Sequence, residues 1–346
     1  MEKFDTIIIG AGPAGLEAAL HLAPEYKVLL IEKEASPGGK LNVWDKLFPD
    51  FTPSSQVLDH FSLLADMPNL TIKPDTICVS AEQLPGGIWK IRDHRGNEYQ
   101  SKTVLATTGF DPFNARRKEE YGYGIYPNVT TSVELEEMLS HKELKLPFRK
   151  EPFPPRIAFI HCVGSRDEKT GNHYCSRNCC ICAVKQAIEV KEMVPAADIY
   201  CFYMDLRMFG ASYEELYRKA QQDYDIHFIR GRVSEISPAM EDRVVLKAED
   251  TLLGRPLKAS FDLVVLMVGM EPSETTRQLA HSLKIKNRYG FINTADSFAN
   301  DHKTSSAGFF AAGTCKRQMS IPETLKDAAA ASLSVIQYLN HLKEND

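Results

Sequence analysis

A chain of 346 residues, 43% of them hydrophobic and 25% charged, has enough apolar side chains for two buried cores, and we expect two domains. The net charge of −5 is spread along the chain without a block of one sign, so the sequence predicts neither a nucleic-acid-binding nor a membrane-binding surface. The chain opens directly into a strand, and no apolar run approaches the roughly 20 residues of a membrane helix, so we expect a cytoplasmic protein.

The N-terminal residues alternate between strand, turn, helix and strand. Residues 4–9 are a β-branched apolar run typical of a buried strand, residues 10–15 are a glycine-rich turn, and residues 16–22 are an apolar helix. A second buried strand at 27–31 ends before Glu32. Glycines in such a turn let backbone amides approach a pyrophosphate at the helix N-terminus, and the acidic residue is placed to bind ribose hydroxyls. The sequence therefore predicts a bound dinucleotide.

A second alternation of strands and helices begins after the proline-rich residues 151–155, near which we place a domain boundary. Apolar runs predict strands at 156–161, 198–204, near Ile226, near Val244 and at Leu263–Val268, with helices at Cys179–Met193 and 213–223. The chain then returns to a strand in GFFAAG (308–313) and to a long Ala-rich helix capped by Ser320.

Four of the eight cysteines fall in one short stretch, at Cys175, Cys179, Cys180 and Cys182. This clustering argues against a spread disulfide framework and favours metal binding or redox chemistry. A fifth, Cys162, follows the strand at 156–161, where a nucleotide-binding domain would carry a second glycine-rich turn. We therefore do not expect NAD(P)H to bind there.

Thiolates that converge on one point bind either a [4Fe–4S] cluster or a zinc ion. Structural zinc sites usually pair their ligands as CxxC knuckles, so the adjacent Cys179 and Cys180 favour the iron–sulfur cluster. Cys182 lies three residues after Cys179 on the predicted helix and is a rival to Cys180 as a ligand. Cys78 and Cys201 lie in strand-like runs and are expected in the core.

Three further segments, at 36–40, 107–109 and 312–314, resemble the flavin-contacting segments of thioredoxin-reductase-like flavoproteins. The resemblance implies FAD as the dinucleotide, with residues 39–41 beside the isoalloxazine. It also implies that the helix from Ile321 aims its positive end at the N1/O2 edge of the flavin. Gly313-Thr314 stand where the disulfide reductases usually have Gly-Asp, so a neutral hydroxyl replaces the ribityl-binding carboxylate.

The same resemblance implies the fold and its domains. The fold is α/β, with two Rossmann-like (three-layer ββα) domains of the thioredoxin reductase or FAD-dependent pyridine nucleotide–disulfide oxidoreductase type. We expect an FAD-binding domain in 1–115 plus 275–346, a connecting segment in 116–155, and a second Rossmann-like domain in 156–274 that carries the cluster in place of NAD(P). The expected FAD-binding residues are Gly10, Gly12, Pro13, Ala14, Gly15, Glu32, Lys33, Gly39, Lys40, Leu41, Thr108, Gly109, Lys185, Gly313, Thr314, Ile321 and Thr324.

The cysteine stretch carries a second and more specific resemblance. CVGSRD at 162–167, YCSRNCC at 174–180 and the lysine at 185 resemble the HdrA subunits of heterodisulfide reductases and of their sulfur-oxidising relatives. The resemblance implies that Lys185 faces the flavin and tunes it. The chain lacks the CxxCxxCxxxCP runs of the methanogenic HdrA subunits, so it resembles the short form. The cluster ligands that the resemblance implies are Cys162, Cys175, Cys179 and Cys180.

The function that this resemblance implies is that of an oxidoreductase: an FAD- and [4Fe–4S]-containing electron-transfer subunit of a heterodisulfide-reductase-like complex, acting in sulfur-compound oxidation. It implies HdrB-like and HdrC-like partner subunits and a homodimer, without nucleic-acid or membrane partners. Two alternatives remain. One is a stand-alone NAD(P)H-dependent disulfide reductase that uses Cys179 and Cys182 as a redox CxxC pair. The other is a non-catalytic scaffold that keeps its cofactors as folding ligands.

Overall fold

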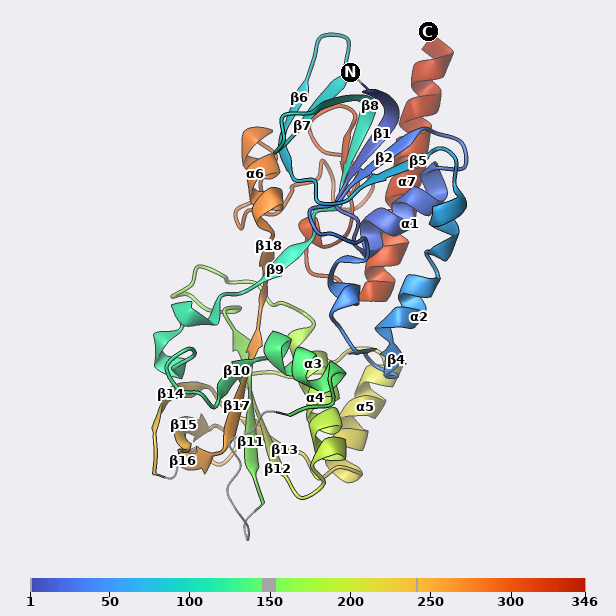
Figure 1. The fold of residues 1–346 in the computed structure, drawn as a ribbon. Coiled ribbons are helices and arrows are strands. Elements are labelled where there is room, and N and C mark those ends of the chain that lie inside the picture. Colours follow the sequence, from blue (N-terminus) through green and yellow to red (C-terminus); the bar gives the residue numbers. More distant parts are fainter. Residues whose placement is uncertain (1, 145–153, 241, 346) are drawn as a thin grey trace. The chain divides into compact units, whose positions relative to one another are not determined.

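The structure, a computed structural model, describes residues 2–144, 154–240 and 242–345 (Figure 1). The chain divides into two compact units. Unit 1 consists of Met1–Asn42, Ser55–Asp111 and Glu271–Asp346, and unit 2 consists of Val43–Ser54 and Pro112–Met270. The main crossings of the chain between the units are the short paired strands β9 (Phe110–Pro112) and β18 (Met270–Pro272).

Unit 1 is built on a seven-stranded sheet of order β5-β2-β1-β8-β7-β6, in which β19 also pairs with β8. Strands β5, β2, β1, β8 and β19 run parallel, because they are connected by crossovers, whereas β6 and β7 form an antiparallel extension. Helices α1 and α7 pack together beside the parallel part. The bounds are β1 Glu2–Ile9, α1 Pro13–Leu22, β2 Val28–Ile31, β5 Leu70–Lys73, β6 Cys78–Gln83, β7 Trp89–Asp93, β8 Glu98–Ala106, α6 Glu274–Ser282, β19 Phe309–Ala311 and α7 Ile321–Asn345, with the short α2 (Ser54–Asp59) at the boundary of unit 2.

Unit 2 is a three-layer arrangement of helices, a parallel sheet and an antiparallel sheet. The five parallel strands have the order β10-β17-β11-β12-β13, and β14, β15 and β16 form the antiparallel sheet. The bounds are β3 Lys46–Leu47, β4 Thr52–Pro53, β10 Val129–Thr131, α3 Ser132–Ser140, β11 Arg156–Val163, α4 Cys179–Met193, β12 Asp198–Tyr203, α5 Ala211–Gln222, β13 His227–Arg230, β14 Val233–Pro238, β15 Val244–Asp250, β16 Arg255–Phe261 and β17 Leu263–Val268.

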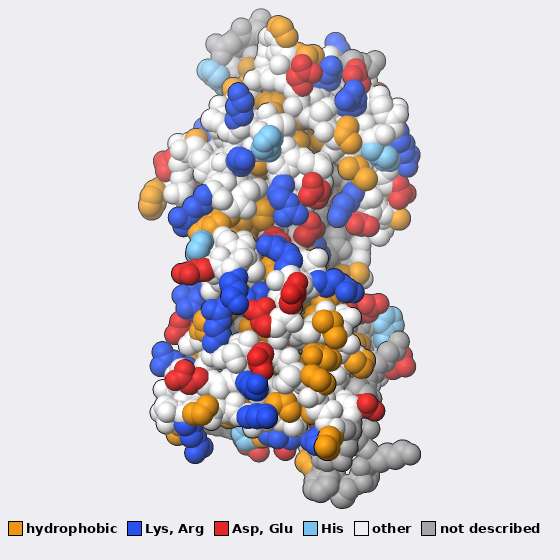
Figure 2. Space-filling view, turned by 90° about the vertical axis from the view of Figure 1, so that its left-hand side faces the viewer, with side chains coloured by type: hydrophobic (Ala, Val, Ile, Leu, Met, Phe, Trp, Pro, Cys, Tyr) orange, Lys and Arg blue, Asp and Glu red, His pale blue; other side chains and the backbone are white. Residues whose placement is uncertain are grey.

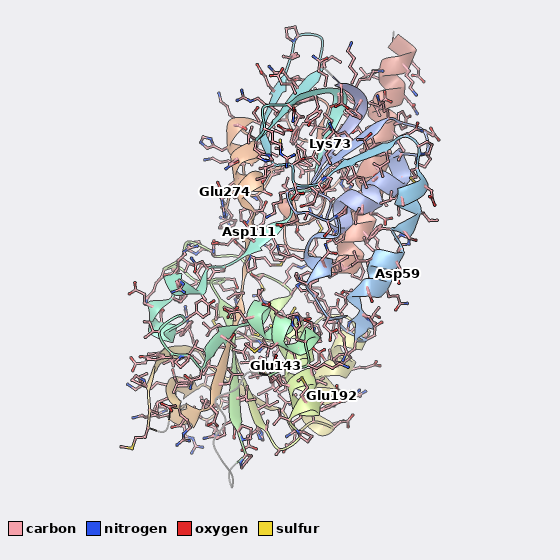
Figure 3. The ribbon with its side chains drawn as sticks, in the orientation of Figure 1. Asp59, Lys73, Asp111, Glu143, Glu192 and Glu274 are labelled. Atoms are coloured by element: carbon pink, nitrogen blue, oxygen red, sulfur yellow. The ribbon has the colours of Figure 1, made fainter. Side chains whose placement is uncertain are left out.

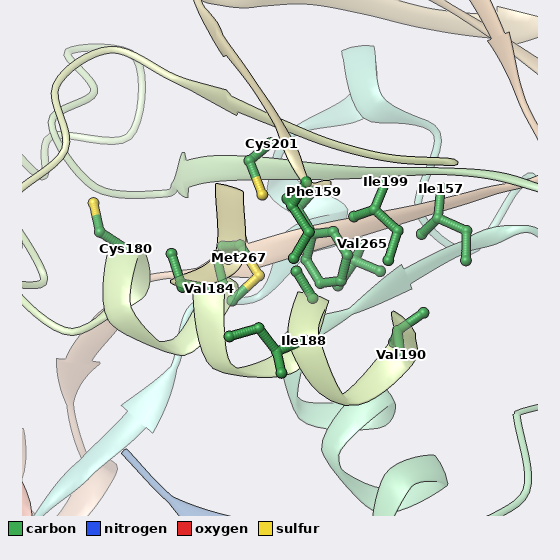
Figure 4. Packing of buried hydrophobic residues seen from close by; sticks show 14 of the residues in the cluster. Ile157, Phe159, Cys180, Val184, Ile188, Val190, Ile199, Cys201, Val265 and Met267 are labelled. Atoms are coloured by element: carbon green, nitrogen blue, oxygen red, sulfur yellow. The ribbon is translucent and has the colours of Figure 1, made fainter. Parts of the chain in front are cut away.

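Helix α4 lies at the centre of the unit 2 core. Its apolar residues Val184 and Ile188 pack with Phe159 of β11 and Val265 of β17 (Figure 4). These side chains are fully or almost fully buried, so the burial of each contributes on the order of 2 kcal/mol. Because β11 and β17 are covered on both faces, their sequences are apolar without alternation. Cys180 lies on the first turn of α4, at the end of this cluster.

The predicted α/β fold is confirmed, and the bounds of α4 and β17 are those expected from the sequence. The first helix was expected from residue 16 but begins at Pro13, since proline fits the first helical position, where its missing N–H has no partner to lose. The segment 116–155, expected to connect the domains, contributes β10 and α3 to unit 2 in its described part, because β10 pairs with β17. Of the proline-rich residues, 151–153 lie outside the described residues.

Two surface properties bear on partners. Within the described residues, no helix combines the length and apolar character needed to cross a bilayer. Figure 2 shows positive and negative side chains interspersed over one face of the chain.

The serine cap predicted for the last helix is present, because Ser320 and Glu323 exchange hydrogen bonds at the start of α7.

Candidate cofactor sites

The glycine-rich turn between β1 and α1 is shaped by close backbone approaches. A Cβ atom at Gly15 would lie 1.9 Å from the carbonyl oxygen of Gly10, so only glycine lets α1 pack onto the turn. Gly10 has φ +105° and lies against the backbone of Thr107. At Gly12 a Cβ atom would meet nothing within 4 Å. The turn is therefore closed on the protein side and open in front of Gly12, which suits a pyrophosphate at the N-terminus of α1.

Glu32 stands at the end of β2, beside this turn. Its carboxylate accepts hydrogen bonds from the backbone N–H groups of Ala11 (2.6 Å) and Glu34 (2.9 Å), and the residue is 4% exposed. These two amides fix the position of the carboxylate beside the glycine turn. Lys33, in contrast, is exposed and pairs with Glu34 at 3.5 Å.

The segment 38–41 folds back onto the glycine turn. The N–H of Gly38 donates to the carbonyl oxygen of Ala11 at 2.8 Å, and a Cβ atom at Gly39 would lie 3.0 Å from the Cα of Gly12. Leu41 is buried. Burial lowers the pKa of Lys40, whose ammonium lies 4.7 Å from the centre of the Phe110 ring. A partly desolvated lysine thus lies next to the open front of the turn.

The segment 107–109 closes β8 next to the same turn. The Thr107 hydroxyl donates to the carbonyl oxygen of Gly10 at 2.7 Å. Ser273 and Thr276, at the start of α6, bond to the backbone oxygens of Thr108 and Gly109. The start of α6 is fixed in turn by the Asp111 carboxylate, which accepts from the N–H of Glu274 at 3.0 Å; both residues are labelled in Figure 3.

The fourth segment, Gly313-Thr314, joins β19 to α7. A Cβ atom at Gly313 would lie 2.9 Å from the Cβ of Ala14 and 3.3 Å from the Thr324 side chain, so this segment packs between the starts of α1 and α7. Asp327, which was not predicted from the sequence, holds this segment, because its carboxylate accepts from the Gly313 N–H at 2.7 Å. Ile321, expected near the flavin, is the first residue of α7.

Asp327 belongs to a partly buried charge cluster with Asp301 and His302, whose ligand atoms lie within 4.8 Å of one another. The ammonium of Lys316 lies in their midst, 2.9 Å from Asp327 and 3.1 Å from Asp301. A cation is thus already provided by the protein, and we interpret the cluster as an ion-pair network. Cys315 is a core residue, since its thiol bonds to backbone oxygens and burial raises its pKa to about 12.

In unit 1 the structure therefore brings together four segments of the chain: the glycine turn, residues 38–41, residues 107–109 and Gly313-Thr314. With Glu32, they all lie at the carboxyl edge of the parallel strands. This edge is where open α/β sheets bind ligands. The open space at Gly12 and the amide-held carboxylate of Glu32 fit a dinucleotide such as FAD.

The second site lies at the carboxyl end of β11 in unit 2. Cys162 interrupts the pairing of β11 with β17 and has φ +60°. Arg166 and Arg177 also have positive φ, at +53° and +59°. Such backbone is unfavourable for residues other than glycine and is concentrated at functional sites in proteins. Here all three positions surround the cysteine stretch.

Three of the predicted ligands interact directly. The neighbouring Cys179 thiol lowers the pKa of Cys162 to about 7 and that of Cys180 to about 4, while its own pKa is raised by the same neighbours. The thiolate is the form that binds metals, and the lowered pKa values favour it at Cys162 and Cys180. Cys175 lies in the loop before α4, where its sulfur accepts from the N–H of Arg177 at 3.3 Å.

Cys182 has different surroundings. It lies further along α4, and burial raises its pKa to about 12. The charged groups near it are Lys185, Glu136 and Glu189. Cys180, in contrast, lies close to His161 and to the backbone of Asp205. The geometry therefore favours Cys180 over Cys182 as a ligand. Cys78 and Cys201 lie in buried apolar clusters, as expected.

Arg166 supplies charge to the cysteine site. Its Nη2 donates to Asp205 at 2.7 Å, whereas its Nη1 is buried and has no hydrogen-bond partner within the described part of the chain. The charges of Cys162 and Cys175 both act on this guanidinium. The ring of His161 is also buried, with the thiols of Cys180 and Cys201 as its neighbours. A buried guanidinium donor without a partner in the described chain, close to thiols, fits an anionic group held beside it.

The pairing of the cysteines along the chain separates the two candidate metals. Structural zinc sites usually present their ligands as CxxC knuckles, whereas two of the predicted ligands, Cys179 and Cys180, are adjacent at the start of α4. In a [4Fe–4S] cluster each of four cysteine thiolates binds a different iron. The four cysteines at this edge are thus of the type and number that such a cluster requires.

Lys185 lies on α4 inside a buried network. Its ammonium donates to Glu136 (2.6 Å) and to the carbonyl oxygen of Lys46 (2.7 Å), and it lies 3.1 Å from Glu189. The carboxylates outweigh the effect of burial and raise the pKa of Lys185. The ammonium thus has two hydrogen-bond acceptors and one further ion-pair partner, all in unit 2. That Lys185 faces the flavin stays a prediction.

Comparison with known proteins identifies relatives of this chain. Residues 1–67 match the Thi4 family. The chain is 32% identical to the iron–sulfur HdrA subunit of the CoB–CoM heterodisulfide reductase of Methanocaldococcus jannaschii, over 95% of this chain and 63% of that protein. It is 40% identical to the HdrA subunit of the H2/formate:CoB–CoM heterodisulfide,ferredoxin reductase of Methanococcus maripaludis, over 67% of this chain and 36% of that protein. The chain is a homologue of HdrA.

This HdrA homologue spans about three fifths or less of the length of these curated relatives. Its fold is that of thioredoxin reductases. The Lactococcus lactis enzyme matches with a TM-score of 0.68 at 19% identity, over 98% of this chain and 99% of that one. The T. acidophilum enzyme matches with a TM-score of 0.67 at 21% identity, over 99% and 100%. The predicted two-domain Rossmann-like fold is thereby confirmed.

Proposed function

We propose that this chain is an oxidoreductase subunit that binds FAD in unit 1 and a [4Fe–4S] cluster in unit 2, and that it transfers electrons within a heterodisulfide-reductase-like complex. FAD supplies chemistry in which electrons move in pairs or singly, and an iron–sulfur cluster supplies single-electron steps. The proposal assigns the FAD-binding domain to unit 1 and the cluster-binding domain to unit 2.

The residues of unit 1 would bind and polarise the flavin cofactor. The amides around Gly12 would hold its pyrophosphate, and the Glu32 carboxylate would accept from ribose hydroxyls. The N-terminal end of α7, near Ile321 and Thr324, would stabilise negative charge on the part of the ring that it faces. Thr314 would offer a neutral hydroxyl to the ribityl chain. Each of these groups is held in place by the contacts of the four segments described above.

The residues of unit 2 would hold the cluster and set its charge environment. Cys162, Cys175, Cys179 and Cys180 would be the four ligands. The Arg177 N–H already donates to the Cys175 sulfur, and the Arg166 guanidinium lies beside two of the ligands. Hydrogen bonds to ligand sulfurs and nearby positive charge both favour the reduced, more negative cluster.

The observation that carries the proposal is the replacement of a phosphate site by sulfur at the end of β11. In place of a second glycine-rich turn, this strand carries Cys162 next to its last residue, and a Cβ atom at Gly164 would lie 2.1 Å from the Phe113 ring. That ring covers the backbone that a second nucleotide would have to approach. The thiols of Cys179 and Cys180 lie together at the start of α4.

The wider setting of the proposal follows the relatives. We propose HdrB-like and HdrC-like partner subunits, a homodimer, a cytoplasmic location and a role in sulfur-compound oxidation. The relatives are named as subunits of heterodisulfide reductases, which supports a place in a multi-subunit complex.

The test is the visible spectrum of anaerobically purified protein, with iron, sulfide, zinc and flavin assayed in the same sample. We expect flavin bands over broad cluster absorbance near roughly 400 nm, with about four iron and four sulfide per chain. Flavin with zinc, or flavin alone, would refute the cluster. Flavin bleaching by NADH, with a Cys179–Cys182 disulfide in the oxidised protein, would instead support a disulfide reductase.

A further inference from the structure

The loop between β12 and α5 lies directly on the cysteine site of unit 2. This loop, residues 205–210 (DLRMFG), approaches Cys180 with its backbone. The carbonyl oxygen of Asp205 accepts from the Cys180 thiol at 3.7 Å, and the backbone N–H of Arg207 also bonds to this sulfur. Cys180 is 2% exposed, whereas Asp205 and Arg207 are exposed. The loop therefore joins a buried ligand to the surface of the unit.

Positive charge surrounds this loop. Asp205 pairs with Arg166 at 2.7 Å and with Arg230 at 3.8 Å. The hydrogen bond from Arg166, together with the charges of Arg230 and Arg207, lowers the pKa of the Asp205 carboxyl. Because Arg166 also faces Cys162 and Cys175, the positive charge at the surface of this loop comes from Arg207 and Arg230, beside the single carboxylate of Asp205. Arg207 and Arg230 are exposed, so this charge is available to a partner.

An exposed aromatic ring lies in the same loop. The Phe209 side chain is 62% exposed, and the guanidinium of Arg177 lies 5.7 Å from the centre of its ring. Arg177 is also the residue whose N–H donates to Cys175. A single exposed aromatic residue is ordinary on a protein surface. Here, however, its ring neighbours an arginine that bonds to a predicted ligand, and arginine and aromatic side chains are enriched at protein interfaces.

We propose that the surface formed by Arg207, Phe209 and Arg230, which we call the arginine loop, is the docking site of an acidic one-electron carrier protein. The inference rests on the proposed function, because it requires a cluster held by the cysteines. In the docked complex one electron moves between the cluster and the redox centre of the carrier, so that one centre is oxidised by one electron as the other is reduced. No bond forms or breaks.

The charge and position of the arginine loop select this partner. Excess positive charge at the site attracts a carrier that has carboxylates around its redox centre and repels a basic one. Phe209 supplies the apolar contact that excludes water at the centre of the interface. The backbone of residues 205–207 then provides a short connection in unit 2 between the carrier and the Cys180 sulfur.

The test measures electron transfer to two carriers of opposite charge by anaerobic stopped flow. In one experiment, dithionite-reduced protein is mixed with ferric cytochrome c, which is basic. In the other, the protein is mixed with an acidic plant-type ferredoxin, and the starting oxidation states are chosen so that electron transfer is downhill according to the measured potentials. For the wild type, we expect the ferredoxin rate constant to fall steeply with ionic strength. The double variant Arg207→Glu/Arg230→Glu should lower it at least about tenfold at low salt and remove most of this dependence.

Matched variants separate docking from folding. Arg255→Glu makes the charge change of one of these two substitutions at an exposed position of β16 and should alter the ferredoxin rate by less than about twofold. Phe209→Ala should lower the rate without changing its salt dependence, because it removes an apolar contact. With cytochrome c, the double variant should react at least as fast as the wild type.

The cluster is quantified in every variant by iron content and absorbance. If the wild type holds no cluster, the proposed function fails. If the cluster is intact but the double variant reacts with ferredoxin like the wild type, or Arg255→Glu is equally slow, docking at the arginine loop is refuted while the proposed function stands.

Discussion

Two glycines of the first turn allow folding and cofactor binding to be tested separately. In Gly15→Ala, the new Cβ atom would lie 1.9 Å from the carbonyl oxygen of Gly10 and 3.0 Å from the Thr107 hydroxyl. The first of these neighbours is backbone, so α1 must move away from the turn. Overpacking of this kind costs about 1–3 kcal/mol, and we expect the upper end because nothing flexible is available to yield.

In Gly12→Ala, the new Cβ atom meets no protein atom within 4 Å. Gly12 has φ −74° and ψ −174°, which alanine adopts without strain, and it caps α1 without a side chain. The loss of stability should therefore be about 1 kcal/mol or less, the difference between glycine and alanine at an N-cap. The methyl group would, however, project into the space proposed for the pyrophosphate. We expect FAD affinity to fall at least about tenfold, or about 1.4 kcal/mol.

Urea unfolding of the FAD-free proteins measures the first effect, and quenching of FAD fluorescence on titration measures the second. The expected pattern is a stable Gly12→Ala protein that binds FAD weakly and a Gly15→Ala protein of lowered unfolding midpoint. If Gly12→Ala binds FAD as tightly as the wild type, the open space at this turn does not hold the cofactor. If Gly15→Ala unfolds like the wild type, the close approach of α1 to the turn does not affect the free energy of unfolding.

Three further predictions concern unit 2. Cys180→Ser should lose most of the cluster iron, whereas Cys182→Ser should keep it, as measured by iron assay on proteins of equal secondary structure; the reverse result would make Cys182 the ligand. Lys118→Met leaves the buried Asp167, 2.6 Å away, without its main partner and should lower the free energy of unfolding in urea by about 3–5 kcal/mol. The control Lys169→Met changes a lysine that is 79% exposed and should lower it by less than about 0.5 kcal/mol. Burial raises the pKa of Asp167, but the hydrogen bond and charge of Lys118 outweigh burial, so this pKa is lowered. The stability that the ionised Asp167 contributes is therefore complete above about pH 3.9 and is lost as the pH falls through the lowered pKa. The pH dependence of the free energy of unfolding should shrink in Lys118→Met.

The elements that could be predicted from the sequence are those whose pattern is set locally. Strand β17 is an unbroken apolar run, and α4 begins at the cysteine pair and ends where its apolar spacing stops, so the bounds of both were predicted correctly. The glycine turn could also be predicted, because a strand, glycines at fixed spacing and a helix are all adjacent in the chain. The N-cap of α7 at Ser320 has the same local character.

The partners of buried charges could not be predicted in this way. The ammonium of Lys185, whose place beside the flavin stays a prediction, binds Glu136, which is 49 residues away, and the carbonyl oxygen of Lys46, which is 139 residues away. No local pattern marks Lys46 as part of unit 2. The same holds for Asp327 and Gly313, whose hydrogen bond depends on how α7 returns to the end of β19. Long-range contacts of this kind are set by the tertiary fold.

The two sites can be understood as two uses of the same edge of a parallel sheet. In unit 1 the strand β1 ends in glycines, whose exposed amides suit phosphate oxygens. In unit 2 the strand β11 carries Cys162 next to its last residue, and the same edge offers the guanidinium of Arg166, with a buried Nη1 that has no partner in the described chain. Phosphate and a thiolate-bound cluster are both anionic, so both need donors and positive charge in the same place. A fold that positions donors there for phosphate can therefore bind a cluster once thiols replace the glycines.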